Sequence, residues 1–182
     1  VQVKEEFGKI PNKLKLINNL KKKIGFPLVV KPLNEGSSVN VFICNKNNVL
    51  KTLKKLKDYG EVLLEKYIPG REIQVAILAD KILGAIELRP TRKFYDYEAK
   101  YNPKAKTKLI IPVEMSKNKY QEVTKLALKA HKILNCRGVT RSDFRFYNNK
   151  FYLLETNTQP GMTSLSLVPE IANFNNITFK NL

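Results

Sequence analysis

The architecture of this 182-residue chain depends most on two stretches, Thr140-Arg-Ser-Asp-Phe-Arg145 and Leu154-Glu-Thr-Asn157. Each belongs to a run in which polar and apolar residues alternate, which predicts two strands, over residues 139–147 and 151–156. The dipeptide Asn148-Asn149 lies between them and favours a tight turn, because asparagine tolerates the left-handed backbone conformation. The pattern therefore predicts an antiparallel hairpin.

The register of this hairpin determines whether its acidic residues can act together. Side chains two apart along a strand share a face, so Glu155 points the same way as Asn157. A two-residue turn would place Glu155 on the opposite face from Asp143. A three-residue loop would pair these two residues directly and would pair Arg141 with Asn157, and we predict that loop or an equivalent bulge. Oxygen ligands gathered in this way suit Mg²⁺, and the alternative is an ordinary solvated hairpin face.

The rest of the chain predicts an α+β fold. Apolar residues at helical spacing predict helices over 11–24, from 49 to about 60, over 120–134 and over 166–174. Strands are predicted over 28–33, 39–44, 61–68, 72–79 and 82–88, and residues 90–116 are predicted to be irregular. Near residues 66–72 the predicted order of elements changes from strands alternating with helices to a β-hairpin, which suggests a boundary, or seam, between two lobes.

The composition narrows the class of protein. Hydrophobic residues make up 43% of the chain, enough to fill a core. No apolar run approaches the roughly 18 residues of a membrane span, and no signal peptide is visible, so we expect no membrane partner. Two cysteines are too few for a disulfide framework or a zinc site, which favours a reduced, cytoplasmic protein.

The charge leaves a second class open. The chain has 33 Lys and Arg against 16 Asp and Glu, a net charge of +17, and a strongly basic domain can bind nucleic acid through its phosphates. However, 27 of those 33 residues are Lys, whereas contacts that read bases favour Arg. We therefore expect a solvated, lysine-rich surface and no specific nucleic-acid partner.

Three further segments carry weaker signals. Lys31 ends an apolar strand and precedes Glu35-Gly-Ser-Ser38, where an ammonium group and loop amides can hold phosphates, although most such loops are only turns. Residues 63–68 end a strand at the expected seam between the lobes, a place that suits the binding of an adenine ring. The alternative is that this segment is a plain edge strand. Four aromatic residues among the charges of residues 94–101 favour an ordered flap, the alternative being an anchored surface loop.

Together these segments resemble the D-alanine–D-alanine ligases of the ATP-grasp superfamily over nearly the whole chain. The likeness rests on five motifs in the family's order: Val30-Lys-Pro32 with Glu35-Gly-Ser-Ser-Val39, Glu65-Lys-Tyr-Ile-Pro-Gly-Arg-Glu72, Phe94-Tyr-Asp-Tyr-Glu-Ala-Lys-Tyr101, Arg141-Ser-Asp-Phe144, and Glu155-Thr-Asn-Thr-Gln-Pro-Gly-Met-Thr-Ser164. The resemblance implies the ATP-grasp fold, in which two α+β lobes with mainly antiparallel sheets grip the nucleotide between them. The lobes would be a truncated central lobe over residues 1–66 and a C-terminal lobe with the magnesium site over residues 67–182.

The resemblance also implies a role for each matching residue. For ATP it implies Lys31 on the α- and β-phosphates, Ser37 and Ser38 in the loop that closes over them, Glu65, Lys66, Tyr67 and Ile68 along the adenine, and Glu72 at the ribose. For Mg²⁺ or Mn²⁺ it implies the ligands Asp143, Glu155 and Asn157, with Glu155 bridging two ions. For catalysis it implies Arg141 on the transferring phosphoryl group and a mobile loop with Lys100 and Tyr101, where Tyr101 closes onto Ser37 and Glu72. For the second D-alanine it implies Gly161, Ser166 and Leu167.

The implied activity is an ATP-dependent carboxylate–amine ligase that joins two D-alanines through an acyl phosphate, for peptidoglycan precursor synthesis. Two departures accompany the resemblance. Ser142 and Thr156 stand where the family usually has aliphatic residues, and both are expected to point away from the ligands. The family's N-terminal domain has no counterpart here, so we expect a fragment that binds ATP and magnesium weakly and lacks the full reaction, unless a second chain supplies that domain in trans.

Four alternatives stay open at this point. The chain could be a non-catalytic, nucleotide-binding remnant or a basic nucleic-acid-binding module. It could also be a sister ligase that takes D-lactate or D-serine as its second substrate. A homodimer remains open as an assembly state.

Overall fold

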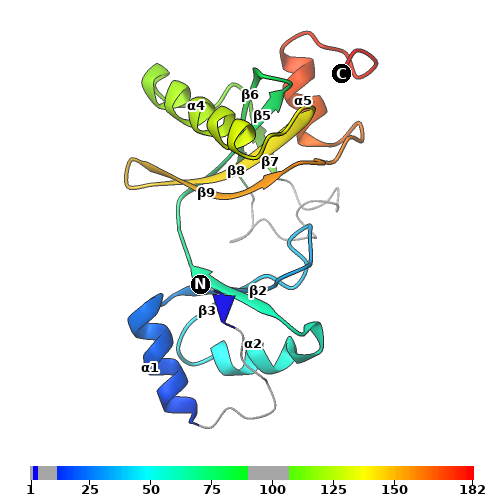
Figure 1. The fold of residues 1–182 in the computed structure, drawn as a ribbon. Coiled ribbons are helices and arrows are strands. Elements are labelled where there is room, and N and C mark those ends of the chain that lie inside the picture. Colours follow the sequence, from blue (N-terminus) through cyan, green and yellow to red (C-terminus); the bar gives the residue numbers. More distant parts are fainter. Residues whose placement is uncertain (1, 4–11, 90–106) are drawn as a thin grey trace. The chain divides into compact units, whose positions relative to one another are not determined.

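The structure, a computed structural model, describes residues 2–3, 12–89 and 107–182 (Figure 1). These residues form two sheets with helices packed on them, and the strand pairs among them are all antiparallel. The chain divides into two compact units, the first ending at Tyr67 and the second beginning at Ile68. The expected α+β fold with mainly antiparallel sheets is therefore confirmed.

The first unit holds a four-stranded sheet in the order β1-β4-β2-β3. Its elements are β1 (Gln2–Val3), α1 (Lys13–Lys23), β2 (Leu28–Pro32), β3 (Phe42–Cys44), α2 (Val49–Lys55), the 3-10 helix η1 (Lys57–Tyr59) and β4 (Val62–Lys66). Buried side chains of the sheet and of both α-helices form its core. α1 starts at Lys13 because the Asn12 side chain caps it, accepting hydrogen bonds from the backbone N–H groups of Leu14 and Lys15 at 3.1 and 3.2 Å.

The second unit holds a five-stranded sheet in the order β7-β6-β5-β8-β9. Its elements are β5 (Arg71–Leu78), β6 (Lys81–Arg89), β7 (Lys108–Ile110), α4 (Lys117–Ile133), β8 (Val139–Tyr147), β9 (Lys150–Asn157) and α5 (Leu167–Phe174). Helix α4 covers one face of this sheet, where Val123 and Ala127 pack on Val75 and Phe144 (Figure 1). Helix α5 covers part of the other face, and the rest of that face carries polar side chains of β5, β8 and β9.

Most predicted elements begin and end within three residues of the observed ones, and β8 has the predicted bounds. The predicted strand over 39–44 is shorter, because Ser37, Ser38 and Asn40 have φ angles of 52°, 59° and 53°, which turn the chain before β3 begins. The prediction that residues 90–116 are irregular is wrong at β7, which pairs with β6. No helix among the described residues is long and apolar enough to cross a lipid bilayer.

Both cysteines are free thiols, and Cys44 is buried at the end of β3. Its Sγ donates a hydrogen bond to Thr52 Oγ1 at 3.3 Å. Burial raises the pKa of the Cys44 thiol, and the hydrogen bond to Thr52 offsets only part of that effect. Cys44 is therefore a packing residue with a protonated thiol.

One buried carboxylate in the second unit is held by two arginines. Glu87 of β6 is 1% exposed, and both Arg71 and Arg89 bind its two oxygens in a bidentate manner at 2.6–3.0 Å. Arg89 also reaches the Glu114 carboxylate at 2.8 Å, and Arg71 donates to the Glu114 carbonyl oxygen. Burial acts to raise the pKa of Glu87, but the two arginines outweigh it, and the pKa lies below its ordinary value.

We predict that Glu87→Gln destabilises the chain by about 2 kcal/mol at pH 7, because each arginine loses a charged hydrogen-bond partner. The folded-state pKa of Glu87 is lowered, so its contribution is present above the unfolded-state pKa of about 4.3 and is lost as pH falls through the folded-state value. Urea unfolding from pH 7 to pH 3.5 should show a constant difference between variant and wild type down to about pH 5, which then narrows. Glu170→Gln, an exposed control on α5, should stay within about 0.5 kcal/mol of wild type. A difference that grows as pH falls would contradict this assignment.

Candidate functional site

The hairpin of β8 and β9 has a two-residue turn and a bulge. Asn148 and Asn149 form the turn with φ angles of 47° and 60°, and Tyr147 pairs with Lys150. The predicted three-residue loop is therefore wrong, because two left-handed asparagines suit a two-residue turn whose twist matches the flanking strands. The alternative, a bulge, is confirmed: the register shifts between Asp143 and Phe144 and leaves one extra residue on β9.

This bulge brings together the expected metal ligands. Asp143 lies directly opposite Glu155, and Arg141 lies directly opposite Asn157. Across the next strand pair, Asp143 lies opposite Gln74 of β5. We call the polar part of the sheet surface on this side the polar face; it comprises Glu72, Gln74, Arg141, Asp143, Arg145, Glu155 and Asn157.

Hydrogen bonds order the centre of the polar face. Arg141 binds Asp143 in a bidentate manner, Nε to Oδ1 at 2.8 Å and Nη2 to Oδ2 at 3.0 Å, with side chains 15% and 11% exposed. Asn157 Nδ2 donates to Glu155 Oε1 at 3.3 Å. In the described part of the chain no three His, Cys, Asp or Glu side chains gather, so a cation here would use the Asn157 amide as well. Two carboxylates and one amide oxygen are hard donors, and this set fits Mg²⁺ or Mn²⁺.

Behind the polar face, Ser142 lies opposite Thr156, and their hydroxyl groups share a hydrogen bond of 3.0 Å. Both residues neighbour a metal-ligand candidate in sequence, so both side chains point to the opposite side of the sheet, as expected. Ser142 is fully buried. The hydrogen bond therefore ties β8 to β9 directly beneath the paired acidic residues.

Glu72, the expected ribose contact, lies on the polar face near the start of β5. Its carboxylate pairs with Arg145 Nη2 at 3.0 Å, and Arg145 Nη1 donates to the Gly70 carbonyl oxygen at 3.1 Å. Gly70 has a φ of +105°, and a Cβ there would lie 2.3 Å from the Phe146 carbonyl oxygen. Only glycine permits this close approach, which fixes the start of β5, and with it Glu72, against β8.

The residues expected to bind phosphate lie in the first unit, on β2 and in the loop after it. Those expected along the adenine lie on β4 and directly after it, where Ile68 already belongs to the second unit. Lys31 Nζ pairs with Glu65 Oε1 at 2.8 Å, a contact that the sequence did not predict. Ser37 and Ser38 lie in the loop with positive φ, and Lys66 ends β4. The Tyr67 N–H donates to the Pro27 carbonyl oxygen at 3.3 Å, and Ile68 opens the second unit.

The expected second-substrate residues lie together before α5. Ser166 occupies the N-cap position of that helix without a side-chain capping bond, and its Oγ instead accepts a hydrogen bond from the Thr163 N–H at 3.0 Å. A Cβ on Gly161 would lie 3.0 Å from the same Oγ, and Leu167 is the first residue of α5. The remaining expected residues, Lys100 and Tyr101, lie outside the described residues.

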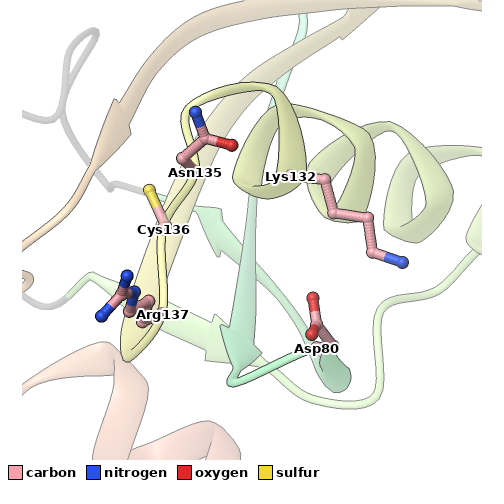
Figure 2. A pocket seen from close by; sticks show the side chains of 5 residues that line it. All are labelled: Asp80, Lys132, Asn135, Cys136 and Arg137. Carbon is pink, nitrogen blue, oxygen red and sulfur yellow. The ribbon is translucent and has the colours of Figure 1, made fainter.

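Two other features lie away from the polar face. His131 of α4 is fully buried and shares a 2.8 Å hydrogen bond, Nδ1 to Thr140 Oγ1, which agrees with the structural role expected for it. An open hollow of about 650 Å³ lies at the end of α4 and the β5–β6 turn (Figure 2). It is lined by Asp80, Lys132, Asn135, Cys136 and Arg137, none of which is a predicted site residue.

The sequence matches a known family over nearly its full length. The family described as D-ala D-ala ligase C-terminus covers residues 3–182. The chain is 63% identical over 177 residues to the D-alanine–D-alanine ligase of Pelagibacter ubique, covering 97% of this chain and 58% of that protein. It is 47% identical over 162 residues to the corresponding ligase of Paramagnetospirillum magneticum, covering 86% of this chain and 53% of that protein.

Solved structures agree with the sequence matches. The crystal structure of D-alanine–D-alanine ligase from Bacillus anthracis matches with a TM-score of 0.77 and 37% identity, over 90% of this chain and 54% of that one. The structure of that ligase complexed with ATP matches with a TM-score of 0.76 and 28% identity, over 100% of this chain and 55% of that one. The fold is therefore the ATP-grasp fold of these ligases. The chain spans about half the length of the curated relatives it matches.

We predict that Arg141 and Asp143 are energetically coupled by about 2 kcal/mol, because both side chains are largely buried and two charged hydrogen bonds join them. The coupling is measured by urea unfolding of Arg141→Met, Asp143→Asn and the double variant. The more exposed pair Lys119 and Glu122 of α4, joined at 2.7 Å with side chains 23% and 43% exposed, serves as the control and should couple by about 0.5 kcal/mol. Equal coupling energies for the two pairs would contradict the prediction.

Proposed function

The chain belongs to the D-alanine–D-alanine ligase family, and from this membership we propose that it supplies the ATP- and metal-binding part of an ATP-dependent ligase that joins two D-alanines. The observation that carries the proposal is the pairing of Asp143 with Glu155, beside Asn157 and Arg141, on one face of the second unit. The product would serve as a peptidoglycan precursor for the cell wall.

Within the second unit, the polar face would bind the metal and the reacting phosphoryl group. Asp143, Glu155 and Asn157 would hold Mg²⁺ or Mn²⁺ through their side-chain oxygens. A bound divalent cation would neutralise charge on the phosphate oxygens. Arg141 would carry out the same electrostatic task with its guanidinium, and its bidentate contact to Asp143 keeps that group on the polar face before any ligand binds.

The other residues would bind the nucleotide and the second substrate. Lys31 would bind the α- and β-phosphates, with Ser37 and Ser38, whose φ angles are positive, in the loop that closes over them. Glu65, Lys66, Tyr67 and Ile68 would line the adenine, and Glu72 would accept the ribose hydroxyls. Lys100 and Tyr101 would belong to a closing loop. Gly161, Ser166 and Leu167 would bind the second D-alanine.

This distribution of groups suits the formation of an amide from a carboxylate. A carboxylate is a poor electrophile, and phosphorylation gives it a leaving group that the amine of the second D-alanine can displace. The part of the second unit in this chemistry would be to orient the phosphoryl group through Arg141 and to help exclude water from the reactive intermediate. We propose that the complete reaction also needs the part of the relatives' chain that these 182 residues do not match, in cis or in trans.

Two further points complete the proposal. A cytoplasmic location is proposed because ATP is available there and because D-alanine activation consumes it. A nucleotide-binding protein without ligase activity is the second candidate, and membership of the ligase family favours it over a basic nucleic-acid-binding module.

We predict that the chain binds ATP in the presence of Mg²⁺ and that Glu155→Ala weakens this binding by about tenfold or more, since it removes a metal ligand. Isothermal titration of both proteins with ATP and Mg²⁺ measures the difference. Glu122→Ala, a change at an exposed position of α4, is the control and should bind ATP as wild type does.

Three results would count against the proposal. Equal affinities of wild type and Glu155→Ala for ATP with Mg²⁺ would contradict the proposed metal site. Absence of ATP binding by the wild-type chain would contradict the proposed nucleotide site as well. Steeply salt-dependent DNA binding, with no shift of Tm by ATP, would favour the basic module.

A further inference from the structure

Gln74 is a polar residue at the centre of the second sheet that no part of the proposed mechanism uses. It lies on β5 within the otherwise apolar run Ile73–Ile77, and it is 1% exposed. Its carboxamide oxygen Oε1 is buried and accepts no hydrogen bond from the described part of the chain. Buried amide oxygens are nearly always paired, so an unpaired one at this position requires an explanation.

The register places this oxygen beside the expected metal ligands. Along one line across the sheet, Ile86 of β6, Gln74 of β5, Asp143 of β8 and Glu155 of β9 lie opposite one another in turn. Side chains directly opposite in an antiparallel pair share a face, with Cβ atoms about 5 Å apart. The Gln74 carboxamide is therefore a direct neighbour of the Asp143 carboxylate on the polar face.

The two residues directly opposite Gln74 offer it no hydrogen-bond donor, and the diagonal residues Arg141 and Arg145 donate to Asp143, and to Glu72 and the Gly70 carbonyl oxygen, respectively. Ile86, on one side, is apolar and packs against α5. Asp143, on the other side, is a carboxylate, and both of its oxygens accept hydrogen bonds from Arg141. An acceptor flanked by an apolar side chain and an ionised acceptor needs a donor that the described protein does not provide. A donor that arrives with a ligand would pair this oxygen.

We propose that Gln74 is a positioning residue of the metal site, whose Oε1 accepts a hydrogen bond from a water molecule on the cation that Asp143 helps to hold. Mg²⁺ usually keeps several of its waters, and water on a divalent cation is a strong donor. A group one ladder position away from a metal ligand is well placed to bind such a water. This inference rests on the proposed function, since it assumes that a divalent cation binds at the polar face.

The assignment implies opposite effects on stability and on metal binding. In the metal-free chain the unpaired oxygen is a cost, so replacing Gln74 by methionine, which has similar shape and no strong acceptor, should leave Tm unchanged or higher. In the loaded chain the same replacement removes a hydrogen bond and should weaken metal binding. A glutamine with only a packing role would show no change in metal affinity.

The test measures Mn²⁺ affinity from the electron paramagnetic resonance signal of free Mn²⁺, with a non-hydrolysable ATP analogue at saturating concentration, and Tm without metal. Gln74→Met should bind Mn²⁺ about tenfold more weakly than wild type, with Tm equal or higher. Gln74→Glu keeps an oxygen at this position and should retain at least the wild-type Mn²⁺ affinity at pH 8. Val75→Ala, one residue along β5 and facing α4, should lower Tm and leave Mn²⁺ affinity unchanged.

The outcomes separate this inference from the proposed function. If wild type binds Mn²⁺ in the presence of the nucleotide and Gln74→Met binds it with equal affinity, the inference about Gln74 is overturned and the proposed function stands. If wild type does not bind Mn²⁺, both the inference about Gln74 and the proposed metal site are overturned. If Gln74→Met does not fold, Gln74→Glu decides: at least wild-type affinity supports the hydrogen bond, and a tenfold loss overturns it.

Discussion

The arrangement of the polar face depends on one constraint, the alternation of side chains across a strand. A two-residue turn at Asn148 and Asn149 would, in a regular ladder, place Glu155 on the opposite face from Asp143. The extra residue accommodated between Leu153 and Glu155 changes that relation, so that Asp143 pairs with Glu155 and Arg141 with Asn157. Because of this bulge, the proposed metal ligands Asp143, Glu155 and Asn157 lie on the same face of the sheet.

The surroundings of the bulge hold this register from both sides of the sheet. Beneath it, Phe144 is buried under α4, and the Ser142 and Thr156 hydroxyls are joined at 3.0 Å. Above it, the bidentate contact of Arg141 orients Asp143. A slip of one residue would expose Phe144 and bury the charged pair, which is unfavourable on both counts. The proposed metal-binding arrangement and the packing of the second unit therefore require the same register.

The sequence predicted local features better than partners. Helices and strands follow from periodicity and caps, and the asparagines indicated the place of the turn but not its length. The pairing of Asp143 with Glu155 was anticipated because both strands are adjacent in the chain. Glu87 with Arg71, Lys31 with Glu65, and Glu72 with Arg145 were not anticipated, because each contact depends on which strands are neighbours in the sheet. Gln74 was predicted only as part of the strand over residues 72–79, because its position becomes meaningful only when β5 is placed beside β8.

The hydroxyl pair beneath the polar face has an evolutionary consequence. Ser142 is fully buried, so replacing Thr156 alone by an aliphatic residue strands a hydroxyl group without its partner. Replacing both together restores a dry contact of similar size. An ancestral exchange between the hydroxyl version and an aliphatic version would thus have passed through a less fit intermediate, and the two positions form an epistatic pair that relatives are expected to exchange in concert.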